Sequence, residues 1–167
     1  MSSFMNLVGL KAGSETANLA PYHTMFNFLF AYVFLSSRGL KHYLKIDHNV
    51  SPREDVSKYG ERAVAEGKIT KRQLNLAKRN EAAHANSMEH FPVFAASAIF
   101  ATVAGVSNPH INGVCTIYTT ARIVYAVSYL VIEKVEYSYI RSLAWWASNI
   151  ACLNLFWAAG KALNKTA

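Results

Sequence analysis

The sequence predicts an all-α integral membrane protein built as a bundle of four helices. Apolar residues make up 52% of the 167-residue chain and charged residues only 16%, whereas a soluble domain of this size usually has about 25% charged residues. The mean hydropathy is positive, at +0.11. The apolar residues also gather into segments of roughly 20 residues, which is the length that crosses a hydrocarbon core of about 30 Å as a helix.

The membrane helices are expected within a single domain covering residues 1–167, at about 21–44, 75–106, 111–132 and 143–160. The second helix should begin early, because Thr70 is placed as its N-cap. Pro92 lies inside it, and membrane helices tolerate such a proline when neighbouring helices satisfy the freed carbonyl. Residues 46–74 are expected to form the main aqueous loop.

The positive charge is concentrated in one part of the chain, which argues for membrane topology. Of the 17 Lys and Arg residues, 11 fall between Arg38 and Arg79, and the net charge is +7. Few aromatic side chains interleave them, so we expect no nucleic acid partner. The positive-inside rule then predicts a multi-pass protein with both basic loops in the cytoplasm and both termini on the lumenal side.

Polar side chains at membrane depth mark a candidate site on the second helix. Asn86 and Glu89 are three residues apart and share a face, and Arg79 lies seven residues before Asn86 on the same stripe. His84 and His90 point to different faces, so we expect no metal. An ionisable group at this depth costs about 2.5–3.5 kcal/mol, so we interpret its presence as the mark of a functional site.

The third helix has a matching stripe around one arginine. Arg122 lies within an apolar segment, with Tyr118, Tyr125 and Tyr129 at helical spacing. One interpretation is an Arg122–Glu89 ion pair that only locks the bundle. The other, which the surplus of polar groups favours, is a site for a charged, hydrogen-bonding ligand. We expect Tyr118 to be a core residue.

Residues 79–94, RNEAAHANSMEHFPVF, resemble the signature of the membrane-associated proteins in eicosanoid and glutathione metabolism, the MAPEG family. The spacing of Arg122, Tyr125 and Tyr129 is similar to that family, and so is the Ser51–Asp55 turn after the first helix. The resemblance covers nearly the whole chain. It implies a homotrimer in the endoplasmic reticulum membrane, which binds glutathione between subunits on the cytoplasmic side.

The resemblance also implies a role for individual residues. Two arginines would activate the thiol of glutathione, and a further set of polar residues would hold its peptide backbone, its amine and its carboxylates. The implied catalytic residues are Arg38 and Arg122, and the implied glutathione-binding residues are Arg79, Asn86, Glu89, His90, Tyr125 and Tyr129.

The implied function is that of a membrane-bound glutathione-dependent transferase, peroxidase or isomerase acting on a lipophilic electrophile from the bilayer. Two positions depart from the family pattern: Ala82 stands where an arginine is usual, and His90 replaces a tyrosine. The alternative is therefore a membrane isomerase or cyclase of the same fold, or an accessory protein, that does not use glutathione.

Overall fold

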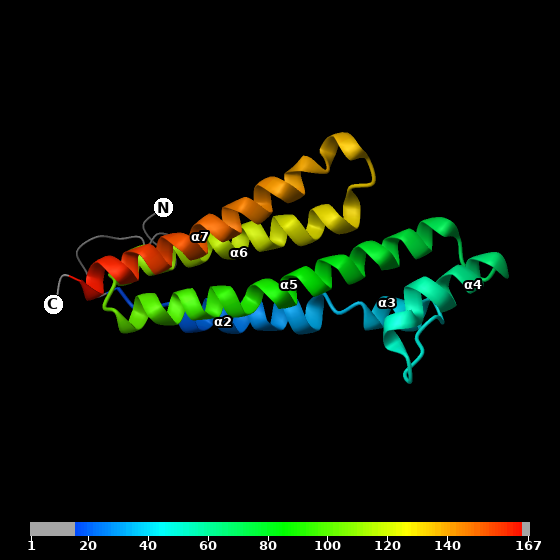
Figure 1. Ribbon diagram of the computed structural model, residues 1–167, viewed down its shortest axis with the longest axis horizontal. Helices are drawn as coiled ribbons and strands as arrows, with labels where there is room; N and C mark the ends of the chain where they lie inside the picture. The colour runs from blue at the N-terminus through cyan, green and yellow to red at the C-terminus, as the bar shows by residue number, and fades with distance from the viewer. Residues whose placement is uncertain (1–15, 165–167) are drawn as a thin grey trace.

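The computed structural model describes residues 16–164, and within them the chain is helical without strands, which confirms the all-α part of the predicted fold (Figure 1). The elements in chain order are α2 (Ala20–Leu29), the π-helix η1 (Phe30–Phe34), α3 (Arg38–Tyr43), the 3₁₀-helix η2 (Pro52–Glu54), the π-helix η3 (Asp55–Tyr59), α4 (Gly60–Ala65), α5 (Lys71–Val103), α6 (Asn108–Val131), the 3₁₀-helix η4 (Val135–Tyr137) and α7 (Tyr139–Leu163).

The long helix α5 runs through the whole molecule and organises the rest (Figure 1). Its 33 residues give a length of about 50 Å at 1.5 Å per residue. Helices α6 and α7 lie side by side along its C-terminal half, α2 lies along the same half, and α3 and α4 gather beside its N-terminal half. One end of the bundle is therefore a four-helix packing, and the other end is open.

The continuous helix expected over 21–44 is interrupted in the structure. Helix α2 passes into a π turn, in which Leu35 N donates to Phe30 O at 3.0 Å, and α3 starts again at residue 38. The carbonyls left free by this break accept from α5: Asn80 Nδ2 donates to Leu35 O at 3.0 Å, and His84 Nδ1 lies 2.9 Å from Ala31 O. Because α5 supplies these donors, the two carbonyls are satisfied in spite of the break.

The start of α5 agrees with the prediction. Thr70 forms a capping box, in which Gln73 N donates to Thr70 Oγ1 at 3.2 Å and Thr70 N donates to Gln73 Oε1 at 2.8 Å. The helix continues through Pro92 without interruption. Helices α6 and α7 have 24 and 25 residues, and each begins three to four residues before its expected start.

The expected aqueous loop at 46–74 is folded. Its apolar side chains form a second small core against the start of α5: Leu44, Ile46, Val56, Ala63, Ile69, Leu74 and Ala77. Gly60, the first residue of α4, packs closely against α5, because a Cβ there would lie 2.5 Å from Leu74 Cδ1 and 3.1 Å from Asp55 O. The loop is thus a structured cap on the open end of the bundle.

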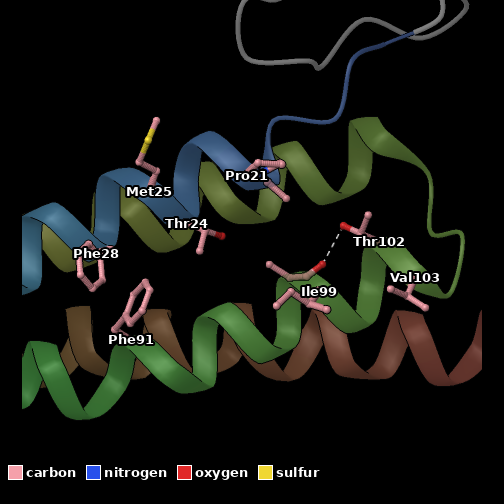
Figure 2. Close-up of a pocket in the computed structure, with 10 residues that line it drawn as sticks. Pro21, Thr24, Met25, Phe28, Phe91, Ile99, Thr102 and Val103 are labelled. Atoms are coloured by element: carbon pink, nitrogen blue, oxygen red, sulfur yellow. Dashed lines mark hydrogen bonds between the residues drawn. The ribbon is translucent and has the colours of Figure 1, made fainter.

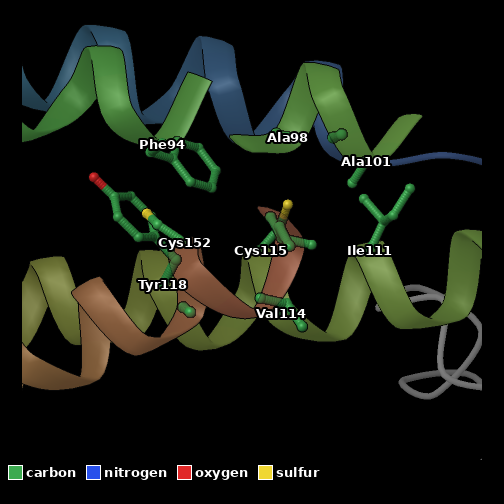
Figure 3. Close-up of a cluster of buried hydrophobic side chains, with 11 residues drawn as sticks. Phe94, Ala98, Ala101, Ile111, Val114, Cys115, Tyr118 and Cys152 are labelled. Atoms are coloured by element: carbon green, nitrogen blue, oxygen red, sulfur yellow. The ribbon is translucent and has the colours of Figure 1, made fainter. Parts of the chain in front are cut away.

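The main core lies between α5, α6 and α7 (Figure 3). Phe94 and Tyr118 stack with their ring centroids 3.8 Å apart, so Tyr118 is a core residue as expected. Ala98, Ala101 and Ala151 are small enough to let the helix backbones approach closely. The free cysteines Cys115 and Cys152 are both buried in this core.

The outer surface of the bundle is apolar over most helices. Side chains such as Phe34, Val103 and Trp157 are at least 68% exposed. Soluble monomers rarely expose contiguous apolar patches larger than a few hundred Å². Among the described residues, α6 is long and apolar enough, by length and composition alone, to cross a membrane.

Candidate functional site

Arg122 is the centre of the polar site. It lies on the inner face of α6 and is only 2% exposed. Its Nη2 donates to Asn86 Oδ1 and to Ser87 Oγ, both at 3.0 Å, while its Nη1 is buried without a partner. No carboxylate among residues 16–164 pairs with it. The structure therefore holds a buried cation on neutral partners, and Ser87 is a contact that the sequence pattern did not single out.

A column of cations and aromatic rings leads away from Arg122 toward the open end. Its guanidinium carbon lies 4.5 Å from the centroid of Tyr125, and the rings of Tyr125 and Tyr129 are 5.1 Å apart. Arg141, at the start of α7, lies with its guanidinium carbon 4.6 Å from the Tyr129 ring. The stripe predicted on α6 is confirmed, and Arg141 extends it. The sequence pattern did not reveal Arg141, because it lies on a different helix from the rest of the stripe.

His90 faces the core of the same protomer. It is 7% exposed, and its Nδ1 lies 3.1 Å from the hydroxyl of Tyr118. Its position on α5, four residues after Asn86, puts both side chains toward α6. His90 therefore joins the Arg122 cluster from inside the protomer.

Arg79 lies two helical turns before Asn86, at the open end. Its Nη2 donates to Glu133 Oε1 at 3.0 Å, and Arg72 Nε lies 3.5 Å from the same oxygen. The Nε of Arg79 is buried without a partner. Arg79 lies about 10 Å along α5 from Asn86, which is the residue that accepts a hydrogen bond from Arg122.

Glu89 is not brought to Arg122. It is exposed on the outer flank of α5 and makes no ion pair or hydrogen bond with the described residues. Ala82, which is two turns earlier on this flank, is exposed as well. The Arg122–Glu89 lock is thus absent within the protomer, and the carboxylate of Glu89 faces whatever covers this surface.

Arg38 lies away from the cluster. Its side chain is 57% exposed at the start of α3, 3.7 Å from Asp47 and hydrogen-bonded to Asn49. Within one protomer, these contacts hold Arg38 in the 46–49 turn, and none joins it to Arg122.

A second buried charge cluster ties the folded loop to α5. Lys41 Nζ lies 2.6 Å from Glu81 Oε1 and 3.3 Å from Asp55 Oδ2, and Asp55 also accepts from His48 N at 2.9 Å. Lys41 and Asp55 are 5% and 0% exposed. The sequence pattern gave Lys41 only a place at the end of a membrane segment, because its partners are 14 and 40 residues away.

Two cavities adjoin these helices. One, of about 530 Å³, is almost wholly apolar and lies between α2 and the C-terminal part of α5 (Figure 2). The other, of about 790 Å³, opens where the first helix breaks and is lined by Tyr32, Val33, Phe34, Ser36, Gly39, Leu40, Leu76, Asn80 and Leu130. The second combines apolar walls with the amide side chain of Asn80 on α5. Within residues 16–164, no three His, Cys, Asp or Glu side chains are placed to hold a metal.

Comparison with known proteins identifies one family. The model of the MAPEG family matches residues 24–161, which contain all of the side chains described above. A search of the curated proteins and a search of the solved structures each found no significant match.

Proposed function

Since the chain belongs to the MAPEG family, whose members are membrane proteins, we propose that it is a membrane-bound glutathione-dependent transferase, peroxidase or isomerase. Its substrate is a lipophilic electrophile that enters from the bilayer. Glutathione binds at the polar cluster of α5 and α6, with its negative charge toward Arg122 and Arg79.

The observation that carries this proposal is the unpaired charge of Arg122. A buried cation costs several kcal/mol unless an anion repays its desolvation, and here the partners are the neutral Asn86 and Ser87. A cation kept at this cost, with Nη1 free of any partner, is what an anion-binding site requires before its ligand arrives.

The residues fit glutathione in charge and in extent. Arg79 and Asn86 are separated by about 10 Å along α5, and Arg79 and Glu89 by about 15 Å. A tripeptide in extended form spans about 10 Å. Guanidinium groups suit its carboxylates, and the carboxylate of Glu89 suits its amine. The spacing of Arg79 and Asn86 therefore matches the length of a tripeptide, and the charges of the set suit an anionic peptide with one amine.

The residues of the site then bind glutathione and orient its thiol. Bound glutathione supplies a thiol, whose thiolate form is the nucleophile. Arg122 provides positive charge in a partly desolvated place, which favours the charged form of an acidic group beside it. Tyr125 holds the guanidinium of Arg122 by stacking, and Asn86 and Ser87 fix its orientation. Arg38 would have to act across a subunit boundary.

The lipophilic substrate has a place beside this site. The cavity of about 790 Å³ opens at the break in the first helix, and Asn80 in its wall directly follows Arg79. Pockets for small ligands usually have about 300–1,000 Å³ and mostly apolar walls. We propose that an electrophile passes from this cavity to the polar cluster, because the cavity is lined by Asn80 of α5 and Leu130 of α6, the two helices that carry the cluster.

A homotrimer accounts for the exposed carboxylate of Glu89. At membrane depth an uncovered charge costs about 2.5–3.5 kcal/mol, so a neighbouring subunit is proposed to cover it. We also propose four membrane spans in the endoplasmic reticulum, with the 46–74 loop and the open end in the cytoplasm and the termini in the lumen.

Isothermal titration of the detergent-purified protein with glutathione tests the function. Saturable binding is expected in the wild type and is lost in Arg122→Met. Lys161→Met, which removes a cation at the far end of α7, serves as the matched control and should bind like the wild type. Unchanged binding in Arg122→Met would overturn the assignment.

One observation favours the alternative of an enzyme or accessory protein that does not use glutathione. His90, which replaces a tyrosine of the family pattern, is engaged with Tyr118 inside its own protomer. In this case the wild type would give no heat with glutathione at millimolar concentration, although the protein is folded.

A further inference from the structure

Glu133 occupies the arginine pair at the mouth of the site. It follows the C-terminal end of α6 directly, in the link to α7. One of its oxygens, Oε1, lies 3.0 Å from Arg79 Nη2 and 3.5 Å from Arg72 Nε. The two arginines are seven residues apart, so they lie on one stripe of α5.

We propose that Glu133 is an internal substitute for the ligand's carboxylate, which competes for Arg79 and thereby sets the affinity of the site. The ligand class is a carboxylate-bearing anion. The inference rests on the proposed function for the identity of that anion, glutathione, but the competition itself concerns only the arginines and Glu133.

The geometry of the Arg79 contact makes Glu133 replaceable. Arginine usually binds a carboxylate with two parallel hydrogen bonds, but Glu133 accepts only from Nη2, and the Nε of Arg79 is buried without an acceptor. A carboxylate that meets both nitrogens satisfies a donor that Glu133 leaves unpaired. Glu133 is thus held more weakly by Arg79 than a ligand carboxylate that accepts from both nitrogens.

Exposure points the same way. The side chains of Glu133 and Arg72 are 44% and 85% exposed, whereas that of Arg79 is 19% exposed. Exposed ion pairs contribute little to stability, because water and salt screen them. Glu133 can therefore leave Arg79 at small cost while Arg79 stays in place on its helix.

The nearby Glu136 provides a matched control. It lies in η4, three residues from Glu133 on the same link, is exposed, and makes no ion pair with the described residues. Glu133→Ala and Glu136→Ala remove the same charge from the same segment. A difference between them reports the contact with Arg79 and not the overall potential.

Titration with glutathione in detergent measures the effect. Glu133→Ala should tighten binding about twofold to fivefold, the range that an exposed ion pair covers, while Glu136→Ala should leave it unchanged. In an Arg79→Ala background, the gain from Glu133→Ala should vanish. Equal gains in both alanine variants, or weaker binding in Glu133→Ala, would overturn the proposal.

A second measurement does not depend on glutathione. Phenylglyoxal modifies arginine, and mass spectrometry of the digested protein gives the extent of modification at Arg79. Modification should rise in Glu133→Ala and stay at the wild-type level in Glu136→Ala. If no variant binds glutathione but Arg79 shows this rise, the proposed function fails and the internal competition stands; if the reactivity of Arg79 is unchanged, the competition is refuted.

Discussion

Replacing Arg122 by methionine separates a binding site from a structural lock. Methionine keeps most of the length and apolar contact of the side chain and removes its charge. A lock residue and a site residue respond in opposite ways to this change, because only a lock contributes to the stability of the ligand-free protein.

The magnitude follows from the contacts of Arg122. The variant loses hydrogen bonds to Asn86 and Ser87, each worth about 1.5–3 kcal/mol when one partner is charged. It also removes a buried cation whose desolvation costs several kcal/mol. The two terms nearly offset each other, so the free energy of unfolding should stay within about 2 kcal/mol of the wild type.

Unfolding by sodium dodecyl sulfate in mixed micelles, followed by circular dichroism, measures this free energy without ligand. Breaking a buried ion pair would instead cost about 3–5 kcal/mol. A loss of that size in Arg122→Met, together with unchanged glutathione binding, would refute the reasoning and restore the lock interpretation.

Three further outcomes are expected, and the same unfolding assay measures the first two. Lys41→Met leaves a fully buried carboxylate unpaired and should cost about 3–5 kcal/mol, whereas Lys58→Met, which breaks an exposed pair, should cost less than about 1 kcal/mol. Thr70→Ala removes the capping box of α5 and should cost about 1 kcal/mol. The hydrogen bond from Lys68 is the main reason why the pKa of Glu66 is lowered from 4.5 to about 2. The stabilising effect of this carboxylate is therefore present above pH 4.5 and is lost as the pH falls toward 2. An NMR titration of Glu66 would measure this pKa.

The sequence was sufficient for the features that depend on local pattern. Apolar segments of helical length predicted the all-α fold, the residue type and position of Thr70 predicted the N-cap of α5, and helical spacing placed Tyr118, Arg122 and Tyr125 on one face, which the structure buries. Each of these follows from residues within a few helical turns.

Contacts between segments that are distant in the sequence could not be predicted from the pattern of residues. The break after Leu29 contains no proline or glycine, and it is stabilised by donors from Asn80 and His84 on another helix. The ion pair of Glu133 with Arg79 joins residues 54 positions apart. Such contacts depend on how the helices pack, which helical periodicity does not specify.

Helix packing also decides why Asn86 contacts Arg122 and Glu89 does not. Their spacing of three puts both on one side of α5, but Asn86 is partly buried beside Arg122, whereas Glu89 lies further from the buried face and is exposed. The sequence could place the polar cluster and could not say which of its members meet within a protomer.

A cryo-electron microscopy map of the protein with glutathione, in detergent or nanodiscs, tests the central claim most directly. The account predicts trimeric particles with density for a tripeptide between subunits, in contact with Arg122 and Asn86 of one subunit. A well-resolved map in which a protein carboxylate pairs with Arg122 and no such density is present would contradict it.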